Sequence, residues 1–314
     1  MASIGSIESA IIKARIMLAQ LVSSLLSEQN GDGGWGAVPG KQSNTEATAF
    51  AVLALESAAA DASRIAKAKS WLINRQNGDG SWSLSDSAKG PSWVTALAII
   101  ALSGSAEESA RVIKAGNWVL EQEGGKPGLL AQLILFVTRQ KRAVRLNQDL
   151  TGWPWTTGNF SWVEPTSYFM IALKRVKPQL PTNAVQERLA QAELMIYDRM
   201  CDGGGWNYGN AEVYDEKLWP YPDTTALALI ATQDRRERNE NRLSLRVLNQ
   251  LATEADSGLA LSWAAICLAL YGQDVAALKS LIVQRFAKTK FLGETKTLAL
   301  AVLALGEGAR YFRV

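Results

Sequence analysis

The chain is organised around a unit that begins Cys201-Asp202-Gly203-Gly204-Gly205-Trp206-Asn207-Tyr208-Gly209. After a polar and aromatic connection, this unit continues Trp219-Pro220-Tyr221-Pro222-Asp223-Thr224-Thr225-Ala226. It combines a glycine-rich turn ending in tryptophan, a loop, an acidic residue at a helix start and an apolar helix. The rest of the chain repeats this unit in variant forms, and an internal repeat of this kind determines the architecture.

Two further copies of the turn lie near the N-terminus. They read Gln29-Asn30-Gly31-Asp32-Gly33-Gly34-Trp35 and Gln76-Asn77-Gly78-Asp79-Gly80-Ser81-Trp82. The apolar segments that begin at Thr48 and Thr95 follow the two tryptophans at the same distance. Because the distance along the chain from tryptophan to helix is the same in both copies, the two segments form a true repeat.

The predicted helices fall into two alternating sets. One set is almost uncharged and rich in alanine and leucine, as is typical of buried helices; it covers residues 47–59, 94–103, 167–173, 224–232, 259–270 and 297–305. The other set carries charges on one side and covers residues 61–75, 106–121, 182–200, 241–254 and 274–286. Further helices are predicted over residues 7–26 and 128–139, and no run of strands is found. The pattern predicts an all-α fold, a single α/α toroid domain over residues 1–314 with about twelve or more helices in two concentric rings.

The composition excludes several kinds of binding and catalytic site. The net charge of +3 over 314 residues gives no electrostatic case for binding nucleic acid. The chain contains no histidine, which excludes histidine-dependent triads, histidine metal ligands and a histidine general base. Cys201 and Cys267 form no CxxC pair and provide no disulfide framework. Acid–base chemistry therefore rests on other side chains, and neither a metal ion nor a cofactor is expected.

Acidic residues recur where the predicted inner helices begin. In a toroid these helices run roughly parallel, so their starts share one mouth; they carry Glu46, Ser92, Glu164, Asp223, Asp256 and Glu294. One explanation is that each acid caps its helix or offsets the helix dipole. The other is that several of them face a central cavity and act as acids, bases or cation binders, with Glu46, Glu164 and Asp223 as the candidates.

Aromatic residues crowd the segments 153–168 and 206–221. The candidate binding residues among the aromatic side chains are Trp93, Trp155, Trp162, Tyr168, Trp206, Trp219 and Tyr221. Aromatic faces stabilise carbocations through cation–π attraction. Exposed tryptophans also bind sugars, and packing of loops over helices is a third explanation.

The turns resemble the QW repeats of the prenyltransferase and squalene oxidase repeat superfamily. This superfamily includes squalene-hopene cyclases, oxidosqualene cyclases and protein prenyltransferase β subunits. Residues 202–206 resemble a degenerate third copy, so the resemblance covers roughly residues 29–231. In such repeats the glutamine is thought to cap a neighbouring helix while the tryptophan stacks on it, which implies that these residues are structural braces.

Each group of relatives needs particular residues for its function, and the chain can be compared with each group at those residues. Protein prenyltransferases bind zinc through Asp, Cys and His, and this chain has no His. Thioester domains of the alpha-2-macroglobulin type need the tetrapeptide Cys-Gly-Glu-Gln, which this chain also lacks. Class II terpene cyclases carry a DxDD motif followed by Thr-Ala at an inner-helix start. Asp223-Thr224-Thr225-Ala226 resembles the end of that motif, with Tyr221 and Thr224 where acids are expected. The resemblance implies that Asp223 is the acid that protonates an alkene or epoxide.

A lone carboxyl at a helix N-terminus is a poor proton donor, because the helix dipole favours its ionised form. Asp223 therefore needs apolar walls or a second carboxyl beside it. Glu212, Asp215 and Glu216 in the preceding loop are the candidates for that second carboxyl.

Three functions stay open. The first is a terpene-cyclase-like isomerase that binds a polyprenyl or squalene-type hydrocarbon in the toroid and converts it by protonation. The second is a non-catalytic toroid that binds a lipid or glycan, or serves as a scaffold. The third is a polysaccharide-active enzyme, because pectate lyases with α/α toroids carry similar Asp-Gly-Gly-Trp turns. A lysine or arginine beside the acids favours this third function, and an acid-lined mouth would suit calcium.

The N-terminus lacks a signal-peptide pattern, and no uncharged apolar run is long enough to span a bilayer. A cytoplasmic location is therefore expected. Contact of the N-terminal helix with a membrane surface stays open, as does the oligomeric state.

Overall fold

The computed structural model describes residues 4–104, 108–126 and 146–314. These residues form twelve α-helices, four short 3₁₀ helices and a single two-stranded hairpin. The helix predicted over residues 128–139 lies outside the described residues. The start of the helix predicted over residues 106–121 does so as well, and α5 is seen from Ser109.

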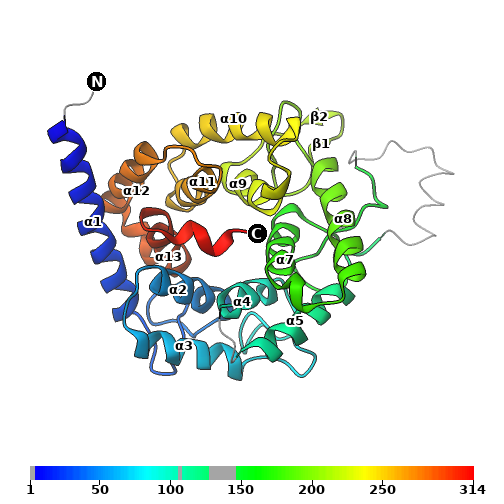
Figure 1. Ribbon diagram of the computed structural model, residues 1–314, viewed down its shortest axis with the longest axis horizontal. Coiled ribbons are helices and arrows are strands. Elements are labelled where there is room, and N and C mark those ends of the chain that lie inside the picture. The colour runs from blue at the N-terminus through cyan, green and yellow to red at the C-terminus, as the bar shows by residue number, and fades with distance from the viewer. Residues whose placement is uncertain (1–3, 105–107, 127–145) are drawn as a thin grey trace.

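Six helices form an inner ring (Figure 1), and they are α2 (Thr45–Ser57), α4 (Val94–Leu102), α7 (Val163–Val176), α9 (Pro222–Ala231), α11 (Gly258–Leu270) and α13 (Thr295–Leu305). Each inner helix contacts the next along the chain, and α13 contacts α2, which closes the ring. All residues of α4 are buried, and the other inner helices are buried along most of their length. Burial on all sides explains why these segments are almost uncharged.

An outer layer of amphipathic helices covers this ring, and it consists of α3 (Ala62–Asn74), α5 (Ser109–Glu121), α8 (Thr182–Asp198), α10 (Asn239–Glu254) and α12 (Ala276–Thr289). The N-terminal helix α1 (Ile4–Ser27) contacts α12, α13 and α2 and so completes the outer layer. The all-α toroid predicted from the alternation of helices is confirmed. Among the described helices, none is both long and apolar enough to cross a membrane.

The glycine–tryptophan turn recurs four times in the described part of the chain, with the same hydrogen bonds each time. The backbone N–H of each tryptophan donates to a threonine hydroxyl in the next inner helix at 2.9–3.0 Å, in the pairs Trp35–Thr48, Trp82–Thr95, Trp153–Thr166 and Trp206–Thr225. The indole N–H of each donates to the carbonyl at the end of an outer helix, at 2.7–3.0 Å. The copy at Trp153 was not recognised from the sequence, because its turn lacks the run of glycines.

The glutamine of the first two turns ties the turn to the next outer helix. Gln29 Nε2 donates to the Gly33 carbonyl at 2.8 Å and to the Arg64 carbonyl at 3.0 Å. Gln76 Nε2 makes the equivalent bond to the Arg111 carbonyl, also at 3.0 Å. The bracing role implied by the resemblance therefore matches the observed contacts.

The threonines of these pairs allow a test of the fold with two adjacent residues. Thr225 Oγ1 accepts from the buried Trp206 N–H, whereas Thr224 Oγ1 is buried without a partner among the described residues. We expect Thr225→Val to lower the free energy of unfolding by about 1–3 kcal/mol, because it leaves the Trp206 N–H unsatisfied. Thr224→Val should leave stability unchanged or raise it slightly. Urea denaturation of both variants checks this, and equal losses would contradict the assignment of the bond.

The C-terminal segment closes one end of the ring. The 3₁₀ helix η4 (Gly308–Phe312) lies in the centre of the ring in Figure 1. Arg175, near the end of α7, donates to the Tyr311 carbonyl at 2.7 Å, and Gln233, after α9, donates to the Phe312 carbonyl at 2.8 Å. Because both donors follow or end inner helices, η4 covers the ends of these helices, and we call the opposite end of the ring, where the inner helices start, the mouth.

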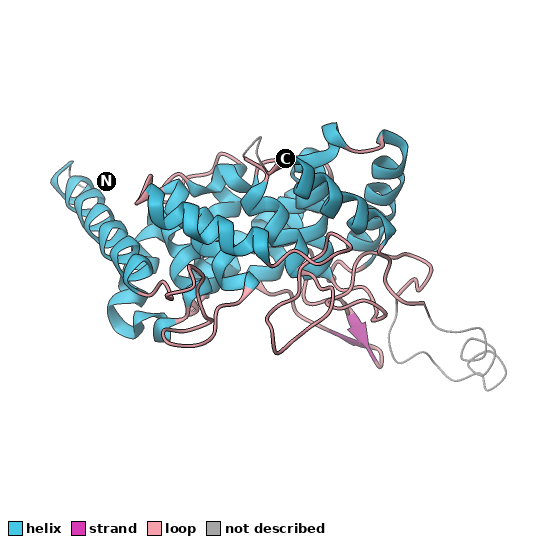
Figure 2. Ribbon diagram, turned by 90° about the horizontal axis from the view of Figure 1, so that it is seen from below, coloured by secondary structure: helices cyan, strands magenta, loops and turns pink. Residues whose placement is uncertain are grey.

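Loops gather at the mouth, on the face opposite the C-terminus (Figure 2). They include the short antiparallel hairpin β1 (Glu212–Val213) and β2 (Glu216–Lys217), which was not predicted. The remaining 3₁₀ helices are η1 (Lys177–Gln179), η2 (Gln233–Arg235) and η3 (Lys290–Gly293).

Candidate active site at the mouth of the ring

Four charged side chains from four inner helices gather at the mouth. Glu46 comes from α2, Glu164 from α7, Asp223 from α9 and Lys296 from α13, each in the first turn of its helix. Lys296 Nζ lies 2.8 Å from Glu46 Oε1 and 3.9 Å from Glu164 Oε1. The charge of Asp223 acts on Glu164. The structure thus brings the three predicted acids together and adds a lysine to them.

Capping does not explain these acids. The N-cap residues of the three helices that carry them are Asn44, Trp162 and Tyr221. Asn44 caps α2 through its side chain, which accepts from the Ala47 N–H at 2.8 Å. Each acid lies two residues after its N-cap residue, so none of the three is the N-cap of its helix.

Aromatic rings lie beneath the charged groups. The ring centroid of Trp93 lies 5.2 Å from that of Tyr168 and 5.0 Å from that of Trp155. Tyr168 also lies 6.5 Å from Phe50 and 6.1 Å from Trp263. The predicted residues Trp93, Trp155 and Tyr168 therefore belong to one cluster. Phe50 and Trp263 complete it and were missed, because buried inner-helix aromatics look like ordinary core residues in a sequence.

Glu164 is the carboxyl whose protonation the site alters most. Burial raises the pKa of Glu164, the nearby Lys296 lowers it, and the charges of Asp223 and Glu46 raise it, with a result of about 7. The side chain is only 14% exposed. The single ammonium lies closer to Glu46, so it does not offset the cost of burying Glu164. A carboxyl that still holds a proton near neutral pH is a candidate general acid.

Lys296 was not singled out from the sequence. Its ammonium lies 5.7 Å from the ring centroid of Trp93 and 5.8 Å from that of Phe50. Burial lowers the pKa of Lys296, but the charges of Glu46 and the neighbouring glutamates outweigh burial and raise it above its ordinary value. The mouth therefore already holds one positive charge against aromatic faces, an arrangement that favours cations.

The protonation of Glu164 can be followed directly by infrared spectroscopy. We expect the carbonyl stretch of its protonated carboxyl to disappear as the pH rises through about 7, and to be absent in Glu164→Gln. Lys296→Met should move the midpoint to higher pH, because it removes the charge that favours ionisation. Asp223→Asn should move it to lower pH, because it removes a repelling charge. A midpoint near the ordinary glutamate value of about 4.3 would contradict the description of the site.

The same pKa shift has a consequence for stability. The folded-state pKa of Glu164 is raised, so the folded protein binds its proton more tightly than the unfolded chain does. The stabilisation that protonated Glu164 provides is therefore present at low pH and lost as the pH rises through about 7.

A second carboxyl that interacts with Asp223 comes from another inner helix. Glu212 lies in the first strand of the hairpin, and Asp215 and Glu216 are exposed at its tip. Glu164, from the neighbouring inner helix α7, is a carboxyl on which the charge of Asp223 acts. The sequence suggested a second carboxyl only among residues close to Asp223 along the chain, whereas the ring brings this one from another repeat.

Two buried hydroxyls near the acids have no hydrogen-bond partner in the described part of the chain. They are Tyr168 Oη and Thr224 Oγ1. Tyr168 follows Glu164 by one turn of α7, and Thr224 follows Asp223 directly. Buried polar groups are nearly always paired, so two hydroxyls near the acids have hydrogen-bonding capacity that the described residues do not use.

The other predicted aromatic residues lie elsewhere. Trp206 is fully buried in its turn, where it acts as a brace. Trp162 lines a separate pocket of about 240 Å³. Trp219 is 82% exposed on a loop, whereas the ring centroid of Tyr221 lies 5.3 Å from that of Tyr208. The charges of Asp223 and Glu164 act on Tyr208, which places the Tyr208–Tyr221 pair near the charged groups.

The remaining predicted helix starts do not join the site in the same way. Asp256 is exposed and pairs with Arg285, whereas Ser92 is buried beside the second turn. Glu294 accepts from the Thr297 hydroxyl, and its charge acts on Lys296. Across the described ranges, no three Cys, Asp or Glu side chains are arranged to hold a metal ion.

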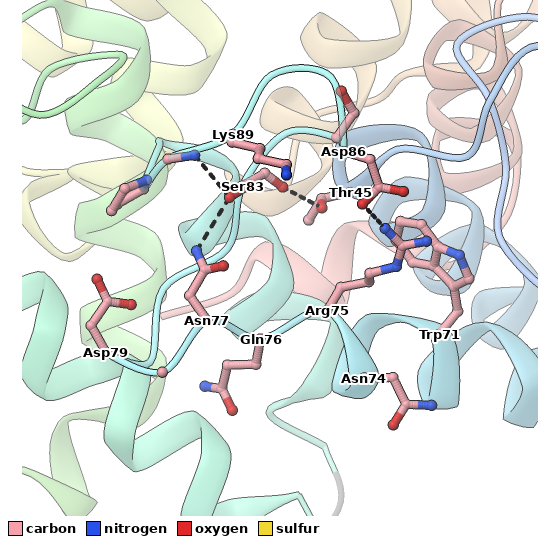
Figure 3. A pocket seen from close by; sticks show the side chains of 14 residues that line it. Thr45, Trp71, Asn74, Arg75, Gln76, Asn77, Asp79, Ser83, Asp86 and Lys89 are labelled. Atoms are coloured by element: carbon pink, nitrogen blue, oxygen red, sulfur yellow. Dashed lines mark hydrogen bonds and ion pairs between the residues drawn. The ribbon is translucent and has the colours of Figure 1, made fainter.

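A polar pocket of about 570 Å³ lies beside the second glycine–tryptophan turn (Figure 3). Two pairs of its side chains bond to one another. Ser83 Oγ accepts from Asn77 Nδ2 at 3.3 Å, Arg75 pairs with Asp86, and the Arg75 guanidinium lies 4.9 Å from the Trp71 ring centroid. The pocket contains none of the predicted site residues, and its hydrogen bonds fix the loop that follows the turn.

No family model and no curated protein sequence matches the chain. Solved structures match it over nearly its whole length. A variant of the type II terpene cyclase MstE from Scytonema, in complex with geranylgeranyl dihydroxybenzoate, superimposes with a TM-score of 0.60 and 14% identity, covering 97% of this chain and 99% of that one.

Two other structures show the same ring. A protein from Actinoplanes has a TM-score of 0.57 at 14% identity and covers 95% of this chain and 99% of its own. An alpha-amylase from Clostridium perfringens has a TM-score of 0.56 at 10% identity and covers 91% of this chain and 96% of its own. At these identities the likeness establishes the fold, and the activity has to be argued from the site.

Proposed function

We propose that the protein binds an isoprenoid chain at the mouth of the ring and isomerises or cyclises it after proton transfer from Glu164. The observation that carries the proposal is the position of Glu164. Its carboxyl is nearly buried, has a pKa of about 7 and lies in the same cluster as the rings of Trp93 and Tyr168. A proton donor above aromatic faces suits a reaction that creates a carbocation.

The reaction begins when the Glu164 O–H gives its proton to the reacting end of the chain. The resulting carbocation is attacked by the next double bond, or it shifts along the chain. Loss of a proton to a base ends the reaction, so one proton enters, one leaves and the product is an isomer of the substrate. Trp93, Tyr168 and Phe50 stabilise the positive charge through their ring faces.

Asp223 has a supporting role in this proposal. Its charge keeps the proton on Glu164 until the substrate arrives, and Lys296 stabilises the carboxylate that remains after transfer. The assignment of the acid thus moves from Asp223, as the resemblance implied, to the neighbouring carboxyl that burial keeps protonated.

The likeness to MstE supports the proposal in two respects. That protein is described with a bound geranylgeranyl compound, and this chain spans 99% of its length. A single ring of this size therefore suffices for a terpene cyclase. The proposal extends to this chain the ability to hold a polyprenyl group.

The test is an incubation of the purified protein with linear isoprenoids of fifteen, twenty and thirty carbons, with and without a terminal epoxide. Gas chromatography and mass spectrometry should reveal an isomer of at least one of them. Recovery of every chain unchanged from protein shown to be folded would reject the proposal in favour of a non-catalytic binding toroid.

A glycan-active enzyme is the second candidate. The mouth is not purely apolar: Lys296 lies beside the acids, and Glu164 can act as a protonated carboxyl beside carboxylates, as in glycoside hydrolysis. The ring is also shared with an alpha-amylase. Release of reducing ends from starch or pectin by the wild type, and not by Glu164→Gln, would favour this function over the isoprenoid one.

A further inference from the structure

The start of the inner helix α13 is held differently from the other helix starts that carry a charged residue of the mouth. The segment that leads into it, residues 271–294, contains no tryptophan, so it lacks the glycine–tryptophan turn that braces α2, α7 and α9. Thr295 provides an anchor in its place. It is 1% exposed; its backbone N–H donates to the Ala37 carbonyl at 2.9 Å, and its hydroxyl donates to the Gly36 carbonyl at 2.7 Å. These bonds fix α13 to the loop that leads into α2.

The same pair of bonds occurs where α2 begins. The Thr45 N–H donates to the Leu84 carbonyl at 2.9 Å, and the Thr45 hydroxyl donates to the Ser83 carbonyl at 2.7 Å. The starts of α4 and α7 are joined to the loop of the next inner helix by a backbone bond from a residue without a hydroxyl, in the pairs Trp93–Trp155 and Val163–Tyr208. A threonine hydroxyl therefore reinforces this link at the starts of α2 and α13.

These two helices are the ones whose charged residues form the ion pair of the mouth. Thr45 directly precedes Glu46, and Thr295 directly precedes Lys296. Lys296 Nζ lies 2.8 Å from Glu46 Oε1 and 3.9 Å from Glu164 Oε1. A lysine side chain is long and flexible, and the attraction between charges falls with distance. The helix start has to be fixed if the ammonium is to stay within reach of both carboxyl groups.

We infer that Thr295 is a positioning residue of the candidate active site, whose hydroxyl fixes the start of α13 and thereby holds Lys296 within reach of Glu164. The position of the ammonium controls how readily this carboxyl gives up its proton. The inference rests on the proposed function, because it assigns Thr295 to the proton donor of that reaction. Thr295 has no charge of its own, so its effect on Glu164 has to pass through the charged groups around it. The titratable and charged groups around Glu164 are Lys296, Asp223, Glu46, Tyr168 and Tyr208.

The test is the infrared titration of the protonated Glu164 carboxyl, which needs no substrate. In Thr295→Val the midpoint should move to higher pH by about 0.5–1 pH unit, the change expected when the ammonium lies about 1–2 Å further from the carboxylate at an effective dielectric constant of about 20. Thr295→Ser keeps the hydroxyl and should keep the wild-type midpoint. In the Lys296→Met background, Thr295→Val should produce no further shift, because no ammonium is left to position.

Thr95→Val is the control for a general loss of stability. Thr95 is fully buried and accepts from the Trp82 N–H at 2.9 Å, but α4 contains no charged residue. This variant should therefore lose stability without moving the midpoint. If Thr295→Val does not fold, Thr295→Ala removes the same hydroxyl and is titrated in its place.

The outcomes separate the inference from the proposed function. An unchanged midpoint in Thr295→Val, a shift to lower pH, or a further shift in the Lys296→Met background overturns the inference and leaves the proposed function intact. A wild-type midpoint near the ordinary glutamate value of about 4.3 removes the proton donor of the proposed function, and the inference with it.

Discussion

Replacement of Glu164 by glutamine is expected to lower the turnover of an isoprenoid substrate by about 10²- to 10⁴-fold, the contribution of a positioned general acid. Glutamine keeps the size and polarity of the side chain but has no proton to give. Substrate affinity should change little, because binding rests on the aromatic rings. Turnover measured at saturating substrate, together with the affinity from fluorescence, separates the two effects.

Two neighbouring variants show which carboxyl carries the proton. Asp223→Asn should lower turnover at pH 7, because Glu164 loses the charge that keeps it protonated, and activity should recover at lower pH. Glu46→Gln should have a smaller effect, since Glu46 is paired with Lys296 at 2.8 Å. Loss of activity in Asp223→Asn at every pH, with Glu164→Gln active, would identify Asp223 as the donor instead.

The second large effect concerns stability. Trp206→Ala is expected to lower the free energy of unfolding by about 3–5 kcal/mol, because it removes a fully buried indole and leaves a cavity. It also removes one of the two donors to the Ile196 carbonyl, which accepts from the indole N–H at 2.7 Å and from the Arg199 N–H at 3.2 Å. Thermal or urea denaturation measures the loss.

Trp219→Ala is the matched control for this variant. The Trp219 side chain is 82% exposed, so its removal should change stability by no more than about 0.5 kcal/mol. Similar losses in the two variants would contradict the bracing role of Trp206. If Trp206→Ala changed ligand selectivity but left stability unchanged, Trp206 would be a ligand-binding residue and not a brace.

The fold could be predicted because most of its helices have a local signal. The buried helices show as uncharged runs of alanine and leucine, and the glycine–tryptophan turns mark where the repeat returns to the inner ring. Where the local signal is weak, prediction fails. The turn at Trp153 makes the same bonds as the others, but Arg188 takes the place of the bracing glutamine and stacks 3.7 Å from the Trp153 ring centroid.

The site could be predicted only in part, because its residues come from separate inner helices that meet only when the ring closes. Glu46, Glu164 and Asp223 were recognisable as acids at helix starts, and their meeting follows from parallel inner helices. Lys296 was not recognisable, since α13 carries no turn of the repeat and meets α2 only when the last inner helix returns to the first. A charged residue in the first turn of an otherwise uncharged helix is the signal that could have found it.

The aromatic candidates show a second limit. Trp93 and Trp206 look equally suited to bind a ligand in the sequence, but one lies under the acids and the other fills a turn. Whether a tryptophan lies under the acids or fills a turn depends on how its segment packs against the inner helix, and the sequence does not show this packing. The Tyr168 hydroxyl, which has no hydrogen-bond partner among the described residues, likewise could not be singled out from the sequence, because hydrogen-bond partners depend on three-dimensional packing.

The most direct test of the central claim is an incubation of the wild type with the epoxide-bearing and hydrocarbon chains in deuterium oxide, followed by mass spectrometry. Proton transfer from a carboxyl that exchanges with solvent predicts a product that contains deuterium at the site of protonation, and Glu164→Gln should form none of it. A product without deuterium would contradict protonation by the enzyme. The same labelled product from Glu164→Gln would show that the proton comes from another residue.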